Sequence, residues 1–252
     1  MQDASRRDEM PSRPSLFGMS SQQQLTEHAP VVFLRGDVGL LHLSLWNAFE
    51  QFRNDFDHLP EDRWLKSDYV FRRRRFSLFS IDTKTRCLSK LARRSFYQSV
   101  EINSYAGGVE RHFDPLEHHT ARNPFLHQLI CDIYGVLPET RTSASQRWEI
   151  GVHLVRVIAH SGQPGHPAPE GMHRDGHAFT SITLVNRTNI EGGVSRFAKK
   201  DGSIYCERTM LEPLETVVFD DNRGLHDVTS VTSGRGTDMG VRDICGFSFN
   251  PM

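Results

Sequence analysis

The chain has 252 residues, of which 37% are hydrophobic and 24% are charged. This length and composition are typical of one globular domain with a buried core, or of two small domains at most. The 30 basic and 31 acidic residues give a formal net charge of -1, so no charge excess indicates a nucleic-acid or membrane partner.

No apolar run approaches the roughly 20 residues that a membrane span needs. The first 24 residues lack the apolar block of a secretion signal. The four cysteines form no CxxC pair: Cys87, Cys131, Cys206 and Cys245. Wide, irregular spacing argues against a disulfide framework or zinc ribbon, so we expect reduced thiols and a cytoplasmic protein.

Composition divides the chain into a tail and a folded part. Residues 1–28 are rich in Ser, Gln, Arg and Pro, so we predict a disordered tail followed by a single domain over 29–252. In the first half, apolar spacing predicts an amphipathic helix over Val38–Phe56, and alternation predicts a strand over Tyr69–Ile81. Two further segments have a helical pattern: Leu88–Tyr97 and Pro124–Tyr134.

The second half has short β-branched or aromatic runs separated by turn signals. The runs are Trp148–His160, Phe179–Val185, Thr216–Phe219 and Arg242–Phe249. Short strands with frequent Gly, Asn and Asp clusters predict an antiparallel sandwich or barrel. We therefore expect a mainly β protein with flanking helices (α+β), in which helical and strand support from 29–140 packs on a β core from 141–252.

A histidine and a carboxylate stand two positions apart at His173 and Asp175. In an extended segment both side chains leave on the same face, where they can bind one metal ion. His226 is the candidate third ligand, since two histidines and one carboxylate are the facial set of non-haem iron(II) oxygenases. The HxD spacing alone is weak evidence, because His112 and Asp114 repeat it and a surface turn explains it equally well.

Arg242 opens an apolar strand after His226. A guanidinium in this place can form a bidentate ion pair with the distal carboxylate of 2-oxoglutarate, whose other end chelates iron. Ser248 lies on the same strand face if no bulge intervenes and adds a candidate hydroxyl contact. The alternative role for Arg242 is a salt bridge to Asp243 or Asp227.

From Glu149 to Phe249 the chain resembles the iron(II)/2-oxoglutarate dioxygenases that include bacterial L-isoleucine 4-hydroxylase. The matching segments are GVHLVR (151–156), HRD (173–175), EGG (191–193), LEPLETVVF (211–219), LHDVTS (225–230) and VRDI (241–244), with weaker similarity in FRRRRFSLF (71–79) and YAGGVERHF (105–113). The resemblance implies a double-stranded β-helix (jelly-roll, cupin-like) core, iron bound by His173, Asp175 and His226, and 2-oxoglutarate anchored by Arg242.

By this resemblance the chain is expected to hydroxylate a small amino-acid-like substrate with O₂, releasing succinate and CO₂, with ascorbate as the reductant in vitro. The isoleucine enzyme has an acidic residue where this chain has Gly176. Residues after the HxD motif often border the substrate, so Gly176 is a candidate substrate contact and isoleucine is not carried over.

Candidate substrate contacts also come from two strands. His153 and Arg156 point to opposite faces, and we favour Arg156 as the carboxylate partner, with His153 as a further candidate. The run 72–75 contains four arginines. Such a run can neutralise nucleic-acid phosphates, but alternation puts two on each face. By the resemblance, Arg72 and Arg74 match family positions, so one of them is expected to reach the substrate carboxylate, and we favour Arg74.

Several alternatives stay open at this point. The same cofactor chemistry can act on an N-acylated amino acid or a secondary-metabolite intermediate, by hydroxylation, desaturation or sulfoxidation. A non-catalytic metal-binding jelly roll retains the metal site without needing Arg242, and a zinc hydrolase needs a general base for which no motif is evident. Three acidic residues near His226 are either partners of its imidazole or turn formers: Asp220, Asp221 and Asp227.

Overall fold

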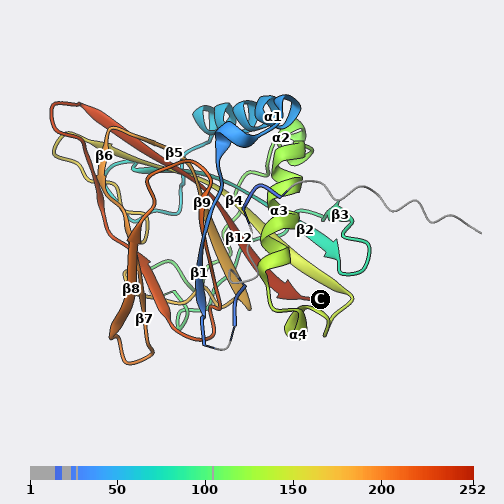
Figure 1. Cartoon of the computed structure of the whole chain (residues 1–252). Coiled ribbons are helices and arrows are strands. Elements are labelled where there is room, and N and C mark those ends of the chain that lie inside the picture. The colour runs from blue at the N-terminus through green and yellow to red at the C-terminus, as the bar shows by residue number, and fades with distance from the viewer. Residues whose placement is uncertain (1–14, 19–23, 27, 104) are drawn as a thin grey trace, which may run out of the picture.

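A computed structural model describes residues 15–18, 24–26, 28–103 and 105–252. A seven-stranded antiparallel sheet forms the centre of the protein (Figure 1). Its strands run in the spatial order β1 (Val31–Arg35), β9 (Glu215–Phe219), β5 (Phe179–Thr188), β12 (Met239–Pro251), β4 (Arg147–His160), β2 (Arg72–Asp82) and β3 (Leu88–Lys90). The fold is therefore mainly β with a jelly-roll core, as predicted.

Two smaller sheets complete the jelly roll. The three-stranded sheet has the order β10 (Leu225–Val228), β7 (Val194–Ala198) and β8 (Ile204–Thr209), and the two-stranded sheet pairs β6 (Ile190–Gly192) with β11 (Val231–Ser233). In Figure 1 the strands β7 and β8 lie on the side of the large sheet that is remote from the helices. One face of the large sheet is thus covered by strands and the other by helices.

The helices are short and lie together. Their bounds are η1 (Val38–Leu40), α1 (Leu43–Asn54), η2 (Asp55–His58), α2 (His118–Ala121), α3 (Pro124–Val136) and α4 (Glu139–Thr142). The helix α3 begins where the side chain of Asn123 accepts hydrogen bonds from two backbone amides and Pro124 occupies the first turn. Phe49 and Phe52 of α1 pack on Phe125 of α3, which joins these helices to the main core. The predicted helix over Pro124–Tyr134 is confirmed, and the one predicted over Val38–Phe56 forms as α1 flanked by the short helices η1 and η2.

Alternation along the central strands separates the helical face from the other face. Ile150, Val152 and Leu154 of β4 belong to the main hydrophobic core with the helices. His153 and Val155, on the opposite parity, line a pocket between the sheets. The strand period therefore decides which side chains of β4 can meet a ligand.

The predicted helix over Leu88–Tyr97 is wrong. Its first residues form β3, in which Leu88 is paired with Ile81 at the edge of the large sheet. Phe96 then forms an isolated bridge with Arg111 and packs its ring 5.3 Å from that of Phe76. Pairing with β2 and a separate aromatic cluster thus override a pattern that favours a helix when it is taken alone.

Part of the predicted disordered tail belongs to the core. Leu16, Phe17 and Leu25 are buried, and the backbone amide of Leu16 donates to Asp132 at 2.6 Å. The rest of that tail, residues 1–14, 19–23 and 27, lies outside the described residues.

The predicted division into N-terminal support and C-terminal core also needs correction, because the two parts share one sheet. The early strand β1 pairs with β9, and β2 pairs with β4 over eleven residues. The first half of the chain therefore supplies strands of the large sheet as well as the helices that cover it.

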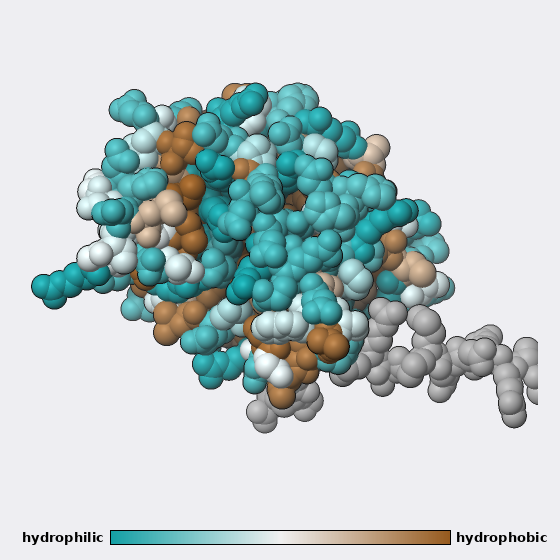
Figure 2. Space-filling model, turned by 90° about the horizontal axis from the view of Figure 1, so that it is seen from above, coloured by the Kyte–Doolittle hydropathy of each residue, from teal (hydrophilic) through white to brown (hydrophobic). Residues whose placement is uncertain are grey.

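Within the described ranges, no helix has the length and apolar character that crossing a membrane requires. The face seen in Figure 2, at the α1 end of the molecule, is mostly hydrophilic, with small separate hydrophobic patches. The four cysteines all lie in the described part of the chain and form no disulfide, and Cys245 is buried.

Candidate metal centre

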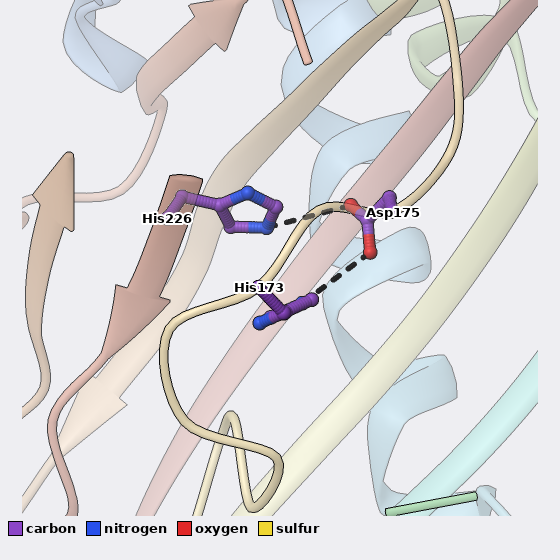
Figure 3. A group of neighbouring side chains, drawn as sticks. All are labelled: His173, Asp175 and His226. Atoms are coloured by element: carbon purple, nitrogen blue, oxygen red, sulfur yellow. Dashed lines mark ion pairs between the residues drawn. The ribbon is translucent and has the colours of Figure 1, made fainter. Parts of the chain in front are cut away.

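The two predicted histidine ligands are paired directly across the backbone. His173 and His226 form an isolated antiparallel bridge, with N–H···O distances of 3.0 and 2.8 Å in the two directions. Their rings lie 4.4 Å apart between centroids. Asp175 follows two residues after His173, and Figure 3 shows its carboxylate facing both imidazoles. The pairing of a loop segment with β10 thus brings the three side chains together.

The distances are those of an ion site. Asp175 Oδ1 lies 3.5 Å from His173 Nε2, and Oδ2 lies 3.5 Å from His226 Nε2. One ligand atom from each residue lies within 4.8 Å of the others. Two imidazole nitrogens and one carboxylate oxygen in a close triangle are the donor set that a mononuclear iron(II) centre with open positions uses. The residues present therefore fit such a metal.

Hydrogen bonding selects the nitrogen that faces the centre. His173 Nδ1 donates to the carbonyl of Gly171 at 2.7 Å, which leaves Nε2 toward Asp175. Burial opposes the charged form of His173, but the hydrogen bond and charge of Asp175 raise the pKa of His173 to about 9. Burial disfavours the ionised carboxyl of Asp175, yet both histidines hold its pKa well below the usual range. The ionised carboxylate of Asp175 thus lies between two imidazoles and favours positive charge on the groups around it.

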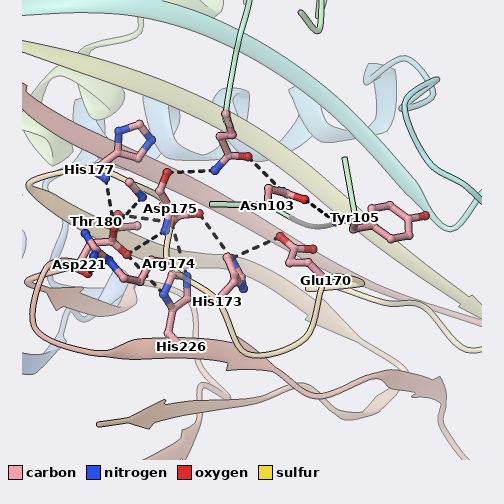
Figure 4. Close-up of polar contacts among 12 residues, drawn as sticks. Asn103, Tyr105, Glu170, His173, Arg174, Asp175, His177, Thr180, Asp221 and His226 are labelled. Atoms are coloured by element: carbon pink, nitrogen blue, oxygen red, sulfur yellow. Dashed lines mark hydrogen bonds and ion pairs between the residues drawn. The ribbon is translucent and has the colours of Figure 1, made fainter. Parts of the chain in front are cut away.

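Asp221 connects the loop to the third ligand. Its buried carboxylate accepts three consecutive backbone amides, those of residues 175, 176 and 177, at 3.0, 2.7 and 3.1 Å. Oδ1 of Asp221 also lies 3.7 Å from Nδ1 of His226 (Figure 4). Asp220 instead pairs with Arg141 at 2.5 Å, and Asp227 pairs with Arg196. Of the three acidic candidates, Asp221 therefore orients the site.

Changing Asp221 to Asn should weaken divalent-metal binding by about 10- to 100-fold, because the amide accepts fewer of the loop's hydrogen bonds and loses the charge beside His226. Titration of the metal-free protein with Co(II) measures this loss. Asp220→Asn is the matched control, because it makes the same change one residue away in a different ion pair. Equal metal affinities for the two variants would rule out the positioning role.

Arg242 and Ser248 both line the pocket beside the triad, on one face of β12. The register of β12 with β5 skips Val185 of β5, while its register with β4 is continuous, so the parity of β12 is kept. Arg242 is 2% exposed, and its Nε and Nη2 atoms are buried without hydrogen-bond partners. Burial and the charge of Arg187 lower the pKa of Arg242 to about 10. A buried fork of unused donors is suited to a carboxylate.

The sheet face that carries Arg242 has further basic side chains on the neighbouring strands β4 and β2. Arg74 and His153 both line the pocket, and Arg74 Nη2 donates to His153 Nδ1 at 2.5 Å. Burial, followed by the charge of Arg74, holds the pKa of His153 well below its usual value, so the ring accepts as a neutral base. Arg73 and Arg75 do not line this pocket, which agrees with the predicted alternation.

The structure corrects the assignment of Arg156. The side chain lies on the helical face, where Nε and Nη2 bind the two oxygens of Asp243 at 2.6 and 2.8 Å and Nη1 lies 2.5 Å from Asp57. Asp243 stands directly opposite Arg156 in the β4–β12 register. The guanidinium is thus satisfied outside the pocket. Of the two candidates on β4, His153 reaches the site and Arg156 does not.

Gly176 has a structural role directly after Asp175. It is not among the described residues that line the pocket. Its φ of +83° is a backbone conformation that favours glycine, and its amide donates to Asp221. An added Cβ would lie 3.1 Å from Ile102. Gly176 therefore shapes the turn after Asp175, and the substrate contact at this position stays a prediction.

We expect Arg156→Ala to lower the free energy of unfolding by about 3 kcal/mol, because it leaves the fully buried carboxylate of Asp243 without its cation. Urea denaturation measures the change. Arg94→Ala is the control, since Arg94 forms a 2.6 Å pair with Glu149 but is 62% exposed. The control should lose no more than about 1 kcal/mol. Equal losses in the two variants would contradict the assignment.

Sequence reasoning missed the polar side chains contributed by loops. Gln98 donates to the backbone carbonyl of Asp175 at 3.0 Å, and it accepts from Arg111 at 2.6 Å. Glu170 and His177 flank the HxD segment and line the pocket. The similarity in YAGGVERHF pointed to the segment that holds Arg111. Loop residues have no periodicity, so nothing in the pattern gave their direction.

Solved structures with the same fold include three with high structural similarity. A bsmA homologue from Methylobium petroleophilum PM1 has 24% identity, a TM-score of 0.75 and 88% coverage of both chains. IDO from Bacillus thuringiensis has 20% identity, a TM-score of 0.70 and coverage of 89% of this chain and 92% of its own. The Fe(II)/(alpha)ketoglutarate-dependent dioxygenase TqaL has 19% identity, a TM-score of 0.65 and coverage of 89% and 83%. At these identities the likeness shows the fold.

A comparison with curated proteins found no match. The model of the 2OG-Fe dioxygenase family matches residues 53–248. That stretch is most of the chain and contains the His-Asp-His cluster, Arg242 and Ser248. The family implies iron(II), 2-oxoglutarate and O₂ as cofactor and co-substrates, and the donor set and the unpaired guanidinium fit them. The chain therefore belongs to the 2OG-Fe dioxygenase family.

Proposed function

We propose that this protein is an iron(II)- and 2-oxoglutarate-dependent dioxygenase that hydroxylates an unactivated C–H bond of a small amino-acid-like substrate. The observation that supports this most is the meeting of three features in one pocket: a His-Asp-His cluster, a buried unpaired Arg242, and a second group of arginines that line the same pocket. The first two fit the metal and its co-substrate. The second group of arginines can bind the acidic group of a separate substrate molecule.

In this proposal His173, Asp175 and His226 hold the metal, and Arg242 with Ser248 holds the distal carboxylate of 2-oxoglutarate. Bound iron(II) supplies the activation of O₂, by which one oxygen atom enters succinate, the other enters the substrate, and CO₂ leaves. The protein's own groups do the positioning. Asp221 and Gln98 fix the loop that carries Asp175 through its backbone. A rigid loop keeps the open metal positions aligned with the two carboxylate sites.

The substrate contacts that we propose are Arg74 and His153. Arg74 lies over the ring of Phe113 with its guanidinium carbon 4.2 Å from the ring centroid, which fixes the plane of the fork. His153 holds one edge of that fork as an acceptor. The Nε atom of Arg74 is buried and has no partner. A substrate carboxylate would satisfy it, and this is the role that an amino-acid-like substrate requires.

The test is succinate formation under air with iron(II), 2-oxoglutarate and ascorbate, across a panel of free and N-acylated amino acids. We expect succinate that depends on one class of substrate, with a product heavier by one oxygen atom. Reactions without iron, without 2-oxoglutarate or without O₂ are the controls. A desaturated or sulfoxidised product would retain the cofactor roles and change the reaction type.

The competing reading is a metal-binding jelly roll without turnover. It predicts metal binding at His173, Asp175 and His226 with no succinate from any substrate. Arg242 favours the enzyme, because a sensor has no evident need for a buried, unpaired guanidinium beside the metal cluster. Metal bound in full, together with no succinate above the background without enzyme, would refute the proposed activity.

A further inference from the structure

The pocket contains three arginines besides Arg242, and one of them is already neutralised. Arg72 Nε lies 2.8 Å from Oδ2 of Asp62, whose side chain is fully buried. The charges of Arg72 and Arg74 lower the pKa of Asp62 against the effect of its burial. Arg72 thus forms a closed ion pair in the wall and needs no anion from a ligand.

The other two arginines, Arg74 and Arg111, form no ion pair with any residue that the structure describes. Their hydrogen bonds go to neutral acceptors, which are His153 for Arg74 and Gln98 for Arg111. Arg111 is 3% exposed. The Nε atoms of both side chains are buried and unpartnered. Arg111 is buried and Arg74 is half-buried, and cations withdrawn from water without an anion are costly, so this part of the pocket is incomplete without a negatively charged ligand.

The two guanidiniums are neighbours over the same aromatic rings. Their Cζ atoms lie 5.3 Å (Arg74) and 4.8 Å (Arg111) from the centroid of Phe96, and 4.2 and 5.9 Å from that of Phe113. Burial, with repulsion from Arg72 and Arg111, lowers the pKa of Arg74 to about 9. Burial and repulsion from Arg72 lower that of Arg111. The charge of Arg111 therefore adds to the need for an anion at Arg74, and the charge of Arg72 adds to that need at both side chains.

The co-substrate does not supply that anion. In the proposed active site, a doubly charged metal and Arg242 face Asp175 and the two carboxylates of 2-oxoglutarate, so positive and negative charges balance in that half. The positive charges of Arg74 and Arg111 are not balanced by these groups, so they are available to the substrate. These two positive charges face one further acidic side chain, that of Glu170.

Glu170 is the counterpart of the two arginines. Apart from Asp175, it is the one acidic side chain among the described residues that line the pocket. Its Oε1 lies 3.3 Å from His173 Nε2, and its side chain is 14% exposed (Figure 4). Glu170 lines the same pocket as Arg74 and Arg111, so its carboxylate is placed to receive a substrate ammonium group.

We infer that the substrate is an α-amino dicarboxylic acid, whose ammonium group binds Glu170 and whose two carboxylates bind Arg74 and Arg111. This inference rests on the proposed function. A neutral amino acid satisfies Glu170 and only one arginine charge. An N-acylated monocarboxylate balances the net charge but offers Glu170 no cation. A dicarboxylic amino acid satisfies all three side chains.

Matched ligands test this in the wild-type protein. Ni(II) replaces iron and N-oxalylglycine fills the 2-oxoglutarate site, so that a dicarboxylate cannot bind there. Calorimetry then compares glutamate with its amide glutamine, aspartate with asparagine, and each acid with its N-acetyl form. We expect at least one acid to bind about 10- to 100-fold more tightly than its amide, because a charged hydrogen bond to buried arginine is lost. Its N-acetyl form should also bind more weakly.

Variants assign the effect to its residues. Arg111→Gln should bring the acid and the amide to within about 2-fold of each other, because the second carboxylate loses its charged donor. Glu170→Gln should weaken the free acid and leave its N-acetyl form unchanged. Arg235→Gln, an exposed position in the loop after β11, is the charge-matched control and should keep the preference. If Arg111→Gln does not fold, the wild-type ligand pairs decide alone.

The outcomes separate this inference from the proposed function. If amides or neutral amino acids bind as well as the acids and promote succinate formation, the dicarboxylate assignment is overturned and the hydroxylase proposal stands. Tighter binding of the N-acetyl forms overturns the role of Glu170 and the assignment with it. If no amino acid or N-acyl derivative binds or promotes succinate formation, both proposals fail.

Discussion

Replacement of Asp175 with alanine is expected to abolish iron-dependent succinate formation, with a loss of roughly 1,000-fold or more, because the site loses its only proposed anionic metal ligand. The remaining pair of His173 and His226 offers two nitrogens and no charge to offset the metal. Turnover with saturating iron(II) and 2-oxoglutarate measures the loss. Metal titration of the same variant should show a matching fall in affinity.

The fold should survive this change. Asp175 comes from a loop and belongs to none of the hydrophobic clusters that hold the sheets and helices together. Asp114→Ala is the matched control, because His112 and Asp114 repeat the HxD spacing and the side chain of Asp114 is 57% exposed. Asp114→Ala should keep wild-type turnover. A folded Asp175→Ala protein with wild-type activity would show that the ligand assignment is wrong.

The second large effect is expected at Arg242. Its replacement with alanine removes the buried fork proposed to bind 2-oxoglutarate, and truncating one partner of such a pair costs about 3 to 5 kcal/mol, or at least about 100-fold in affinity. The apparent KM for 2-oxoglutarate should rise accordingly, while metal affinity measured without the co-substrate stays unchanged. Direct binding of 2-oxoglutarate to the Ni(II) form measures the same loss without turnover.

Arg242→Lys separates charge from geometry. Lysine keeps a cation on β12 but cannot offer two parallel donors, so its affinity for 2-oxoglutarate should lie between those of alanine and arginine. Arg196→Ala, which breaks the ion pair with Asp227 beside His226, is the control for a lost arginine near the site. Unchanged 2-oxoglutarate binding in Arg242→Ala would place the anchor elsewhere in the pocket.

The metal cluster could be predicted because its geometry is local. Two side chains at period two share a face wherever the backbone is extended, so His173 and Asp175 needed no knowledge of the fold. The same parity placed Arg242 and Ser248 together on β12. The register shift between β12 and β5 would have reversed this parity if it lay in β12. It skips a residue of β5 instead and leaves β12 regular.

The residues proposed to contact the substrate could be predicted only in part. Parity showed that His153 and Arg156 point to opposite faces, but it could not show which face the helices cover. The sequence did contain a usable signal, because Asp243 follows Arg242 and so points away from the site. Arg111, Gln98 and Glu170 lie on loops, where direction depends on contacts with distant parts of the chain. The helix predicted over Leu88–Tyr97 was wrong for a related reason, because pairing with β2 decides the conformation of its first residues.

The position of β12 has a consequence for the order of assembly. This strand follows all others along the chain, yet it lies in the middle of the large sheet, between β5 and β4. In the finished fold β4 pairs with β2 and β5 pairs with β9, and β12 is the strand that joins these two pairs, so we expect them to stay unjoined during synthesis until β12 has emerged. Long-range pairing of this kind is slow and leaves strand edges open. A nascent chain stopped before residue 239 should therefore hold two unjoined half-sheets, which makes it a good client for chaperones.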